Sequence, residues 1–201
     1  MKFTNLLLFI CICFSTNAQI LSEKDRATLK DEILADRFDN LLPKLMDETD
    51  IDMWLVISRE YNEDPVIRTM LPSTWLNARR RTILVFYRNK AENKIEKLAV
   101  ARYDVGKSIQ SAWDKEKHPN QWDRLVEIIK ERNPNKIGIN TSKYFGIADG
   151  LVQTDYKELV EALPEDLEKK LVSAEKLAIG WIETRTNKEM HLYNMLVSIT
   201  H

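Results

Sequence analysis

Three short apolar runs between residues 53 and 104 constrain the fold of this chain more than any other feature. They read MWLVIS (53–58), TILVFYR (82–88) and KLAVARYD (97–104), and each contains β-branched or aromatic residues typical of strands. The polar stretch NKAENK joins the second run to the third and predicts a hairpin. The segment 59–81 has two prolines and little periodicity, so it predicts a long loop, and such loops are often functional.

Helical and strand patterns alternate outside these runs. The predicted elements are, in order, helix 22–49, helix 118–133, strand 136–140, helix 154–164, strand 170–174 and helix from 175 onward. Ser22 and Thr154 are the expected N-caps, Pro119 is expected near the first helical position, and Pro43 should kink or split the first helix. The pattern predicts an α/β protein with a mixed β-sheet covered by helices.

The first 18 residues are typical of a secretory signal peptide. Lys2 precedes an apolar run from Leu6 to Phe14, and small residues follow up to Ala18. We therefore expect cleavage after Ala18 and an exported protein, periplasmic or extracellular. Both cysteines of the chain, at positions 11 and 13, would leave with the peptide, so a packed core and not disulfides must hold the mature protein together.

The composition excludes several function classes. With 30% charged residues nearly balanced in sign, the chain lacks the basic excess of a nucleic-acid module. Its three histidines have no metal-binding spacing, the mature chain has no cysteine nucleophile, and its glycines do not form a phosphate-binding loop. The residues therefore predict no catalytic site and no metal or other cofactor in this chain.

Two charged clusters have more than one interpretation. The triplet Arg79-Arg80-Arg81 could hold a phosphate or carboxylate, or it could form a solvated edge with ion pairs. Four carboxylates between Asp47 and Asp52 fit a solvated loop better than an acid–base pair.

Four ordered segments resemble the N-terminal domain of pita-bread metallopeptidases, the creatinase, prolidase and aminopeptidase P family. They are IDMWLVISREYNEDPVIRTMLP, TWLNARRRTILVFYR, KIGINTSKYFGIADGL and LVSAEKLAIGWIETRTNKEM. The similarity is to exported Xaa-Pro peptidases and runs from about Arg37 to the last residue. It implies a creatinase-type N-terminal domain over residues 19–185, with a mixed sheet related to the ribonuclease H fold.

The resemblance also implies a second domain. In that family a C-terminal pita-bread domain holds a pair of divalent metals, expected as Mn, Co or Zn, and its ligands should lie beyond His201. Residues 186–201 would then begin the helix that leads into the catalytic domain, and Thr186 with Glu189 forms the capping box expected at its start.

Three interpretations of the chain remain. The chain is a domain for assembly and substrate gating in a secreted Xaa-Pro aminopeptidase-like hydrolase, or a free-standing binding module without activity, or an enzyme with an unrecognised site. The expected partners are the catalytic domain, the peptide substrate and a homo-oligomer. The residues expected to gate substrate lie in the loop 59–81 and are Tyr61, Asp64, Arg68, Trp75 and Arg79.

Overall fold

The computed structural model describes residues 21–200, so the predicted signal peptide lies outside the described residues. Within this range no helix has the length and apolar character needed to cross a bilayer. The first helical region consists of α2 (Glu23–Asp36), a π-helical turn (Arg37–Leu41) and α3 (Leu42–Thr49). Ser22 caps α2 as predicted by accepting a hydrogen bond from the Asp25 N–H, and Pro43 stands at the start of α3, where the helix is split.

A six-stranded mixed sheet forms the centre of the protein, in the order β4-β3-β2-β1-β5-β6. Its strands are β1 (Met53–Arg59), β2 (Arg81–Asn89), β3 (Lys94–Val100), β4 (Gln110–Ser111), β5 (Ile137–Ile139) and β6 (Leu171–Ser173). β2 is antiparallel to both neighbours, and the pairs β1–β5, β5–β6 and β3–β4 are parallel. The predicted hairpin is therefore confirmed, and five strands share one direction.

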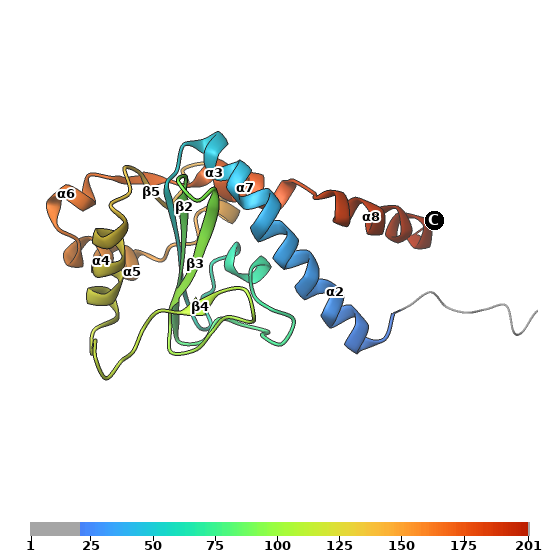
Figure 1. Ribbon diagram of the computed structural model, residues 1–201, viewed down its shortest axis with the longest axis horizontal. Coiled ribbons are helices and arrows are strands. Elements are labelled where there is room, and N and C mark those ends of the chain that lie inside the picture. The colour runs from blue at the N-terminus through green and yellow to red at the C-terminus, as the bar shows by residue number, and fades with distance from the viewer. Residues whose placement is uncertain (1–20, 201) are drawn as a thin grey trace, which may run out of the picture.

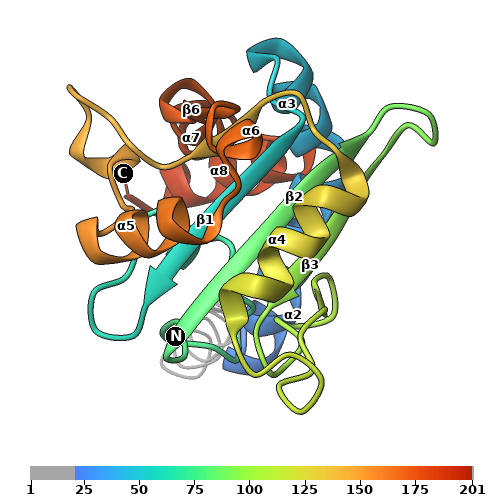
Figure 2. The same cartoon turned by 90° about the vertical axis from the view of Figure 1, so that its left-hand side faces the viewer.

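Helices cover both faces of this sheet (Figures 1 and 2). One layer contains α4 (Gln121–Arg132), α5 (Gln153–Ala162) and the short α6 (Glu165–Glu168). The other contains α2, α3 and α7 (Glu175–Glu183), and α8 (Asn187–Thr200) projects beyond it in Figure 1. This arrangement confirms the predicted α/β class, with a mixed sheet covered by helices.

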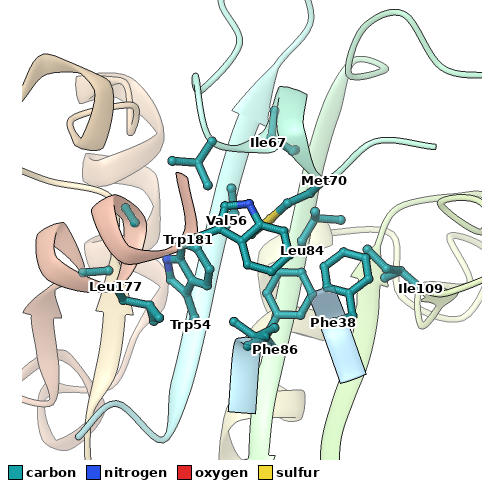
Figure 3. Packing of buried hydrophobic residues seen from close by; sticks show 14 of the residues in the cluster. Phe38, Trp54, Val56, Ile67, Met70, Leu84, Phe86, Ile109, Leu177 and Trp181 are labelled. Atoms are coloured by element: carbon teal, nitrogen blue, oxygen red, sulfur yellow. The ribbon is translucent and has the colours of Figure 1, made fainter. Parts of the chain in front are cut away.

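The alternation of side chains along β1 creates two separate cores. Trp54 and Val56 point to the side of α2, α3 and α7, whereas Met53, Leu55 and Ile57 pack against α4 and α5. Figure 3 shows the first core, where Phe38 stacks on Phe86 and on Trp181 with ring centroids 5.4 Å apart in both pairs. Because both faces of β1 are buried, its sequence is a continuous apolar run and not an alternating one.

Some predicted boundaries were wrong. Asn120 is the N-cap of α4, because its side-chain oxygen accepts the Trp122 N–H, and Pro119 lies outside the helix before this cap. Thr154 lies inside α5, which has no side-chain cap. The third strand ends at Val100 and not at Asp104. The two-residue β4 and the one-turn α6 were missed, because elements this short carry no periodic signal.

The capping box before α8 is confirmed. The Glu189 N–H donates to Thr186 Oγ1 at 3.3 Å, and the Thr186 N–H donates to a Glu189 carboxylate oxygen at 2.7 Å. Arg37 clamps the same carboxylate from the other side at 2.8 Å and also donates to the Thr184 carbonyl. These contacts fix the start of α8 against the end of α2.

Candidate functional site

The strand ends determine where a site can form. β1 and β3 end, and β2 begins, at the same end of the sheet, where Arg59 pairs with Arg81 and Ile83 with Val100. From β1, the chain first adds β2, β3 and β4 on one side of the sheet and later adds β5 and β6 on the other side, so β1 is the point where the strand order reverses. In open α/β sheets, ligands commonly bind beside the carboxyl ends of strands at such a point.

In this protein the crevice beside β1 and β5 is filled by the chain's own side chains. Asp64 is fully buried and accepts hydrogen bonds from Asn140 Nδ2 at 2.8 Å and from the Val66 N–H at 2.7 Å. The Asp64 N–H donates to Ser58 Oγ, and Trp54 Nε1 donates to Asn140 Oδ1. Burial raises the pKa of Asp64, although the hydrogen bonds from Asn140 and the backbone oppose this.

This buried network contains two residues whose sequence context suggested a role at the surface. Asp64 was expected to gate substrate, but its carboxylate is buried and bonded within the protein. The sequence Asn140-Thr141-Ser142 matches a glycosylation sequon, yet Asn140 is 1% exposed and its amide is hydrogen-bonded on both sides. Gly150 packs directly against the same network, and no larger residue fits there, since a Cβ at this position would lie 2.3 Å from the Asp64 carboxyl group.

An open cavity of about 430 Å³ lies on the other side of β1, at the start of β2 and the end of β3. We call it the arginine–aromatic pocket. Its basic lining residues are Arg79, Arg80, Arg81 and Arg102. Its aromatic lining residues are Trp75, Tyr103 and Trp113. Glu60 contributes the pocket's carboxylate.

Two of the predicted gating residues meet in this pocket. The Arg79 guanidinium lies over the Trp75 ring, 4.6 Å from its centroid, and 5.9 Å from the centroid of Tyr103. Trp75 is half-buried and packs partly against the first core, so its ring is held in place. Thr82 fixes the backbone of Arg79 by donating its hydroxyl to the Arg79 carbonyl at 3.1 Å.

Arg81 belongs to the pocket wall and to an ion-pair network behind it. Its Nη2 donates to Glu158 at 2.5 Å, and its Nε lies 3.1 Å from the buried Asp155. Arg59 binds the same Asp155 carboxylate with two nitrogens, at 2.8 and 2.9 Å. Hydrogen bonding from Trp122, together with Arg81, lowers the pKa of Glu158. These partners therefore balance the charge of Arg81 and hold its side chain in place at the pocket wall.

The remaining predicted gating residues do not line the pocket. Tyr61 is 88% exposed at the tip of the loop after β1, with a left-handed φ of 68°. Arg68 is exposed on a 3₁₀ turn (Ile67–Thr69). The predicted set thus divides into Trp75 and Arg79 in the pocket, Tyr61 and Arg68 on the surface, and Asp64 in the interior.

The sequence analysis missed the half of the pocket that follows β3. Arg102 and Tyr103 were assigned to a strand, but they lie just beyond its end. The predicted hairpin could have located them, because it pairs the end of the third strand with the start of the second, next to the arginine triplet. Trp113 could not have been found in this way, since the short β4 that carries it toward the pocket has no sequence signal.

No group of three or more His, Cys, Asp or Glu side chains within residues 21–200 has a geometry that could hold a metal ion. The pocket combines positive charge with aromatic surface, which suits recognition of an anionic group attached to an apolar one.

Comparison with known proteins gives limited overlap. No known protein family matches the chain by a family scan, and no curated protein matches it in sequence. Among solved structures, the chain is similar to a Xaa-Pro dipeptidase from Bacillus anthracis, with a TM-score of 0.45 and 18% identity. The matched region covers 82% of this chain and 38% of that dipeptidase, so the chain corresponds to well under half of its length.

Proposed function

We propose that this chain is the N-terminal accessory domain of a metal-dependent, Xaa-Pro peptidase-like hydrolase and that it gates peptide substrate. The catalytic residues and the divalent metal pair belong, in this proposal, to a pita-bread domain outside the 201 residues. The observation that carries the gating role is the arginine–aromatic pocket, where Trp75 and Arg79 from the predicted gating loop lie together at an open cavity.

The local structure supports this role, because the loop between β1 and β2 is anchored at several points. The buried Asp64 holds its first part, the 3₁₀ turn at Ile67–Thr69 holds its middle, and Ser73 is bound to Asp31 on α2 through both its N–H, at 2.6 Å, and its hydroxyl. A loop anchored in this way presents Trp75 and Arg79 in one fixed geometry, which selection among substrates requires.

Kinetics on the full-length hydrolase test the gating role. We expect Trp75→Ala and Arg79→Gln to lower kcat/KM for short Xaa-Pro peptides by about tenfold, the effect of losing about 1.4 kcal/mol of transition-state binding. Metal content should stay unchanged, because neither residue is expected to be a ligand. Tyr144→Ala is the matched control, since Tyr144 is a 74% exposed aromatic residue that lines a different cavity. Unchanged kcat/KM and peptide-length preference in both pocket variants would leave this domain a scaffold.

The second interpretation, a free-standing binding module, uses the same pocket without a catalytic partner. The reading frame after codon 201 separates the two. A frame that continues into segments rich in Asp, His and Glu supports the accessory domain, whereas an immediate stop codon in the native transcript supports the module.

We also propose export with cleavage after Ala18, on the basis of the sequence pattern of residues 1–18. Intact-mass measurement on protein recovered from its own host is the test. A mature chain that begins at Gln19 is expected, and one that retains Met1 contradicts export by this route.

A further inference from the structure

We infer that the free edge of strand β6 is a dimerisation surface, on which a second copy of this chain pairs its own β6 in antiparallel orientation. The inference is independent of the gating proposal, because β6 lies beyond β5 at one side of the sheet, whereas the arginine–aromatic pocket lies at β2 and β3. It goes beyond the homo-oligomer expected from the sequence, because it names the interface and its register.

The backbone of β6 bonds to the rest of the sheet on one side. There, β5 bonds to the Lys170 carbonyl at 2.9 Å and to the Ala174 N–H at 2.8 Å. Because the hydrogen-bonding groups of successive residues alternate in direction along a strand, the N–H and C=O groups of Leu171 and Ser173 point away from β5. Among the residues that the structure describes, these four groups have no hydrogen-bond partner.

These four groups are complementary to the same four groups of a second copy. When two β6 strands run antiparallel with Val172 opposite the partner's Val172, Leu171 of each copy lies opposite the partner's Ser173. Each of these two pairs exchanges both N–H···O bonds, so all four outward groups of each copy are satisfied. A shift of two residues leaves half of the groups unpaired. The strand therefore specifies one two-fold symmetric register.

The residues around the strand favour the antiparallel orientation. Lys170 directly precedes β6 (Leu171–Ser173), and Glu175 follows it after Ala174. Antiparallel pairing brings the Lys170 end of one copy to the Glu175 end of the other, whereas parallel pairing would bring like charges together. The strand itself contains no charged residue and no proline, which are the usual means of protecting an edge strand from pairing.

An open cavity gives the second copy room at this edge. It has a volume of about 690 Å³, and its lining includes Val172 and Ser173 of β6 together with Tyr144. Val172 packs against the first core, so its side chain lies on the face of the sheet that carries α3 and α7. Side chains of directly opposed residues in an antiparallel pair lie on the same face, so the partner's Val172 would lie beside this cavity. Tyr144 is 74% exposed and adds aromatic surface at the same place.

The size of the interface sets the expected strength of the dimer. A pair of three-residue strands with its flanking side chains is smaller than the interfaces of about 1,200 Å² or more that hold stable complexes together. We therefore expect reversible association between about 10 µM and about 1 mM protein, measured by sedimentation equilibrium of the 201-residue chain.

Disulfide cross-linking tests the register directly. The background has Cys11 and Cys13 replaced by serine, so that an introduced cysteine is the one thiol of the chain. Val172→Cys should cross-link in the presence of copper–phenanthroline, because the two Cα atoms of a central, non-hydrogen-bonded pair lie about 4.5 Å apart, within disulfide reach. Ser173→Cys is the matched control. It is more exposed than Val172, yet its Cα would lie about 8 Å from the partner's Ser173 Cα, beyond disulfide reach.

A proline substitution tests the backbone bonds. Leu171→Pro removes an outward N–H and no bond to β5, so the dimer loses one hydrogen bond per copy. The dissociation constant of the dimer should rise by at least about tenfold. Leu171→Ala is the matched control, because it loses the same side-chain packing but keeps the N–H, and its dissociation constant should stay within about twofold of the parent chain.

Each outcome decides the inference. It is overturned by a chain that stays monomeric up to about 1 mM, by Ser173→Cys cross-linking as fast as Val172→Cys, or by equal association of the Leu171→Pro and Leu171→Ala variants. If circular dichroism shows that Leu171→Pro does not fold, the two cysteine variants decide alone. Faster cross-linking at position 172 than at position 173 supports the proposed register.

Discussion

Two ion pairs connect α2 and its π-helical turn to α8, and they differ mainly in burial. Arg37 and Glu189 are paired at 2.8 Å with side chains 9% and 17% exposed. Lys188 and Glu32 are paired at 2.9 Å with side chains 41% and 55% exposed. We predict that Arg37→Met lowers the free energy of unfolding strongly, and that Lys188→Met has almost no effect.

The magnitude for Arg37 follows from its contacts. Its guanidinium donates to the Glu189 carboxylate, to the Thr184 carbonyl and to the Trp181 carbonyl, and it lies 4.4 Å from the centroid of the Trp181 ring. Removing one partner of a buried ion pair costs about 3–5 kcal/mol because the other charge stays buried. Glu189 retains the Thr186 N–H at 2.7 Å and some solvent contact, so the lower end, about 3 kcal/mol, applies here.

Urea unfolding followed by circular dichroism measures this difference. Methionine at position 37 keeps most of the side-chain volume, and Lys188→Met should change the free energy of unfolding by less than about 0.5 kcal/mol. Glu189→Gln completes a double-mutant cycle, because glutamine can still form the capping box with Thr186. A loss below about 1 kcal/mol for Arg37→Met, or equal losses for Arg37 and Lys188, would refute the reasoning from burial.

Three further predictions concern the interior and the metal. Gly150→Ala should lower the free energy of unfolding, measured by urea denaturation, by about 2 kcal/mol, because the added Cβ would lie 2.3 Å from the Asp64 carboxyl group. Gly146→Ala is the control, because the Cβ added there meets nothing within 4 Å. Burial raises the pKa of Asp64, so folding favours its protonated form. This contribution to stability is fully present below the unfolded-state pKa and is lost as pH rises through the folded-state pKa. The stability advantage of the wild type over Asp64→Asn should therefore shrink as pH rises through that window, and a constant difference across a pH series of urea curves contradicts it. Elemental analysis of the 201-residue chain after dialysis should find no stoichiometric metal, and a peptide assay in added manganese, cobalt or zinc should find no Xaa-Pro hydrolysis. Stoichiometric metal together with turnover would place a catalytic site in this domain.

The candidate site could be predicted only in part. Trp75 and Arg79, which line the pocket, were predicted because a long loop that mixes aromatic and basic residues after a strand is a common place for recognition. Asp64 has the same local features, yet it is buried, since whether a loop carboxylate faces solvent depends on what fills the space beside it. Here that space lies between β1 and β5 and is filled by Asn140 and closed by Gly150.

The sequence by itself determined the elements whose signals are local. The apolar runs of β1 and β2, the polar link to β3, the Ser22 cap, the split at Pro43 and the Thr186–Glu189 capping box depend on residues close together in the chain, so their chemistry can be recognised without a fold.

Only the tertiary structure decided which of the charged residues are paired and which are not. Arg79, Arg80 and Arg81 are consecutive, but Arg81 meets Asp155 from a helix more than 70 positions away in the chain. Arg79 instead stacks on Trp75, and Arg80 is among the residues that line the cavity. The physical reason is that an ion pair depends on distance in space and on burial, and both are set by how β2, β3, α4 and α5 pack together.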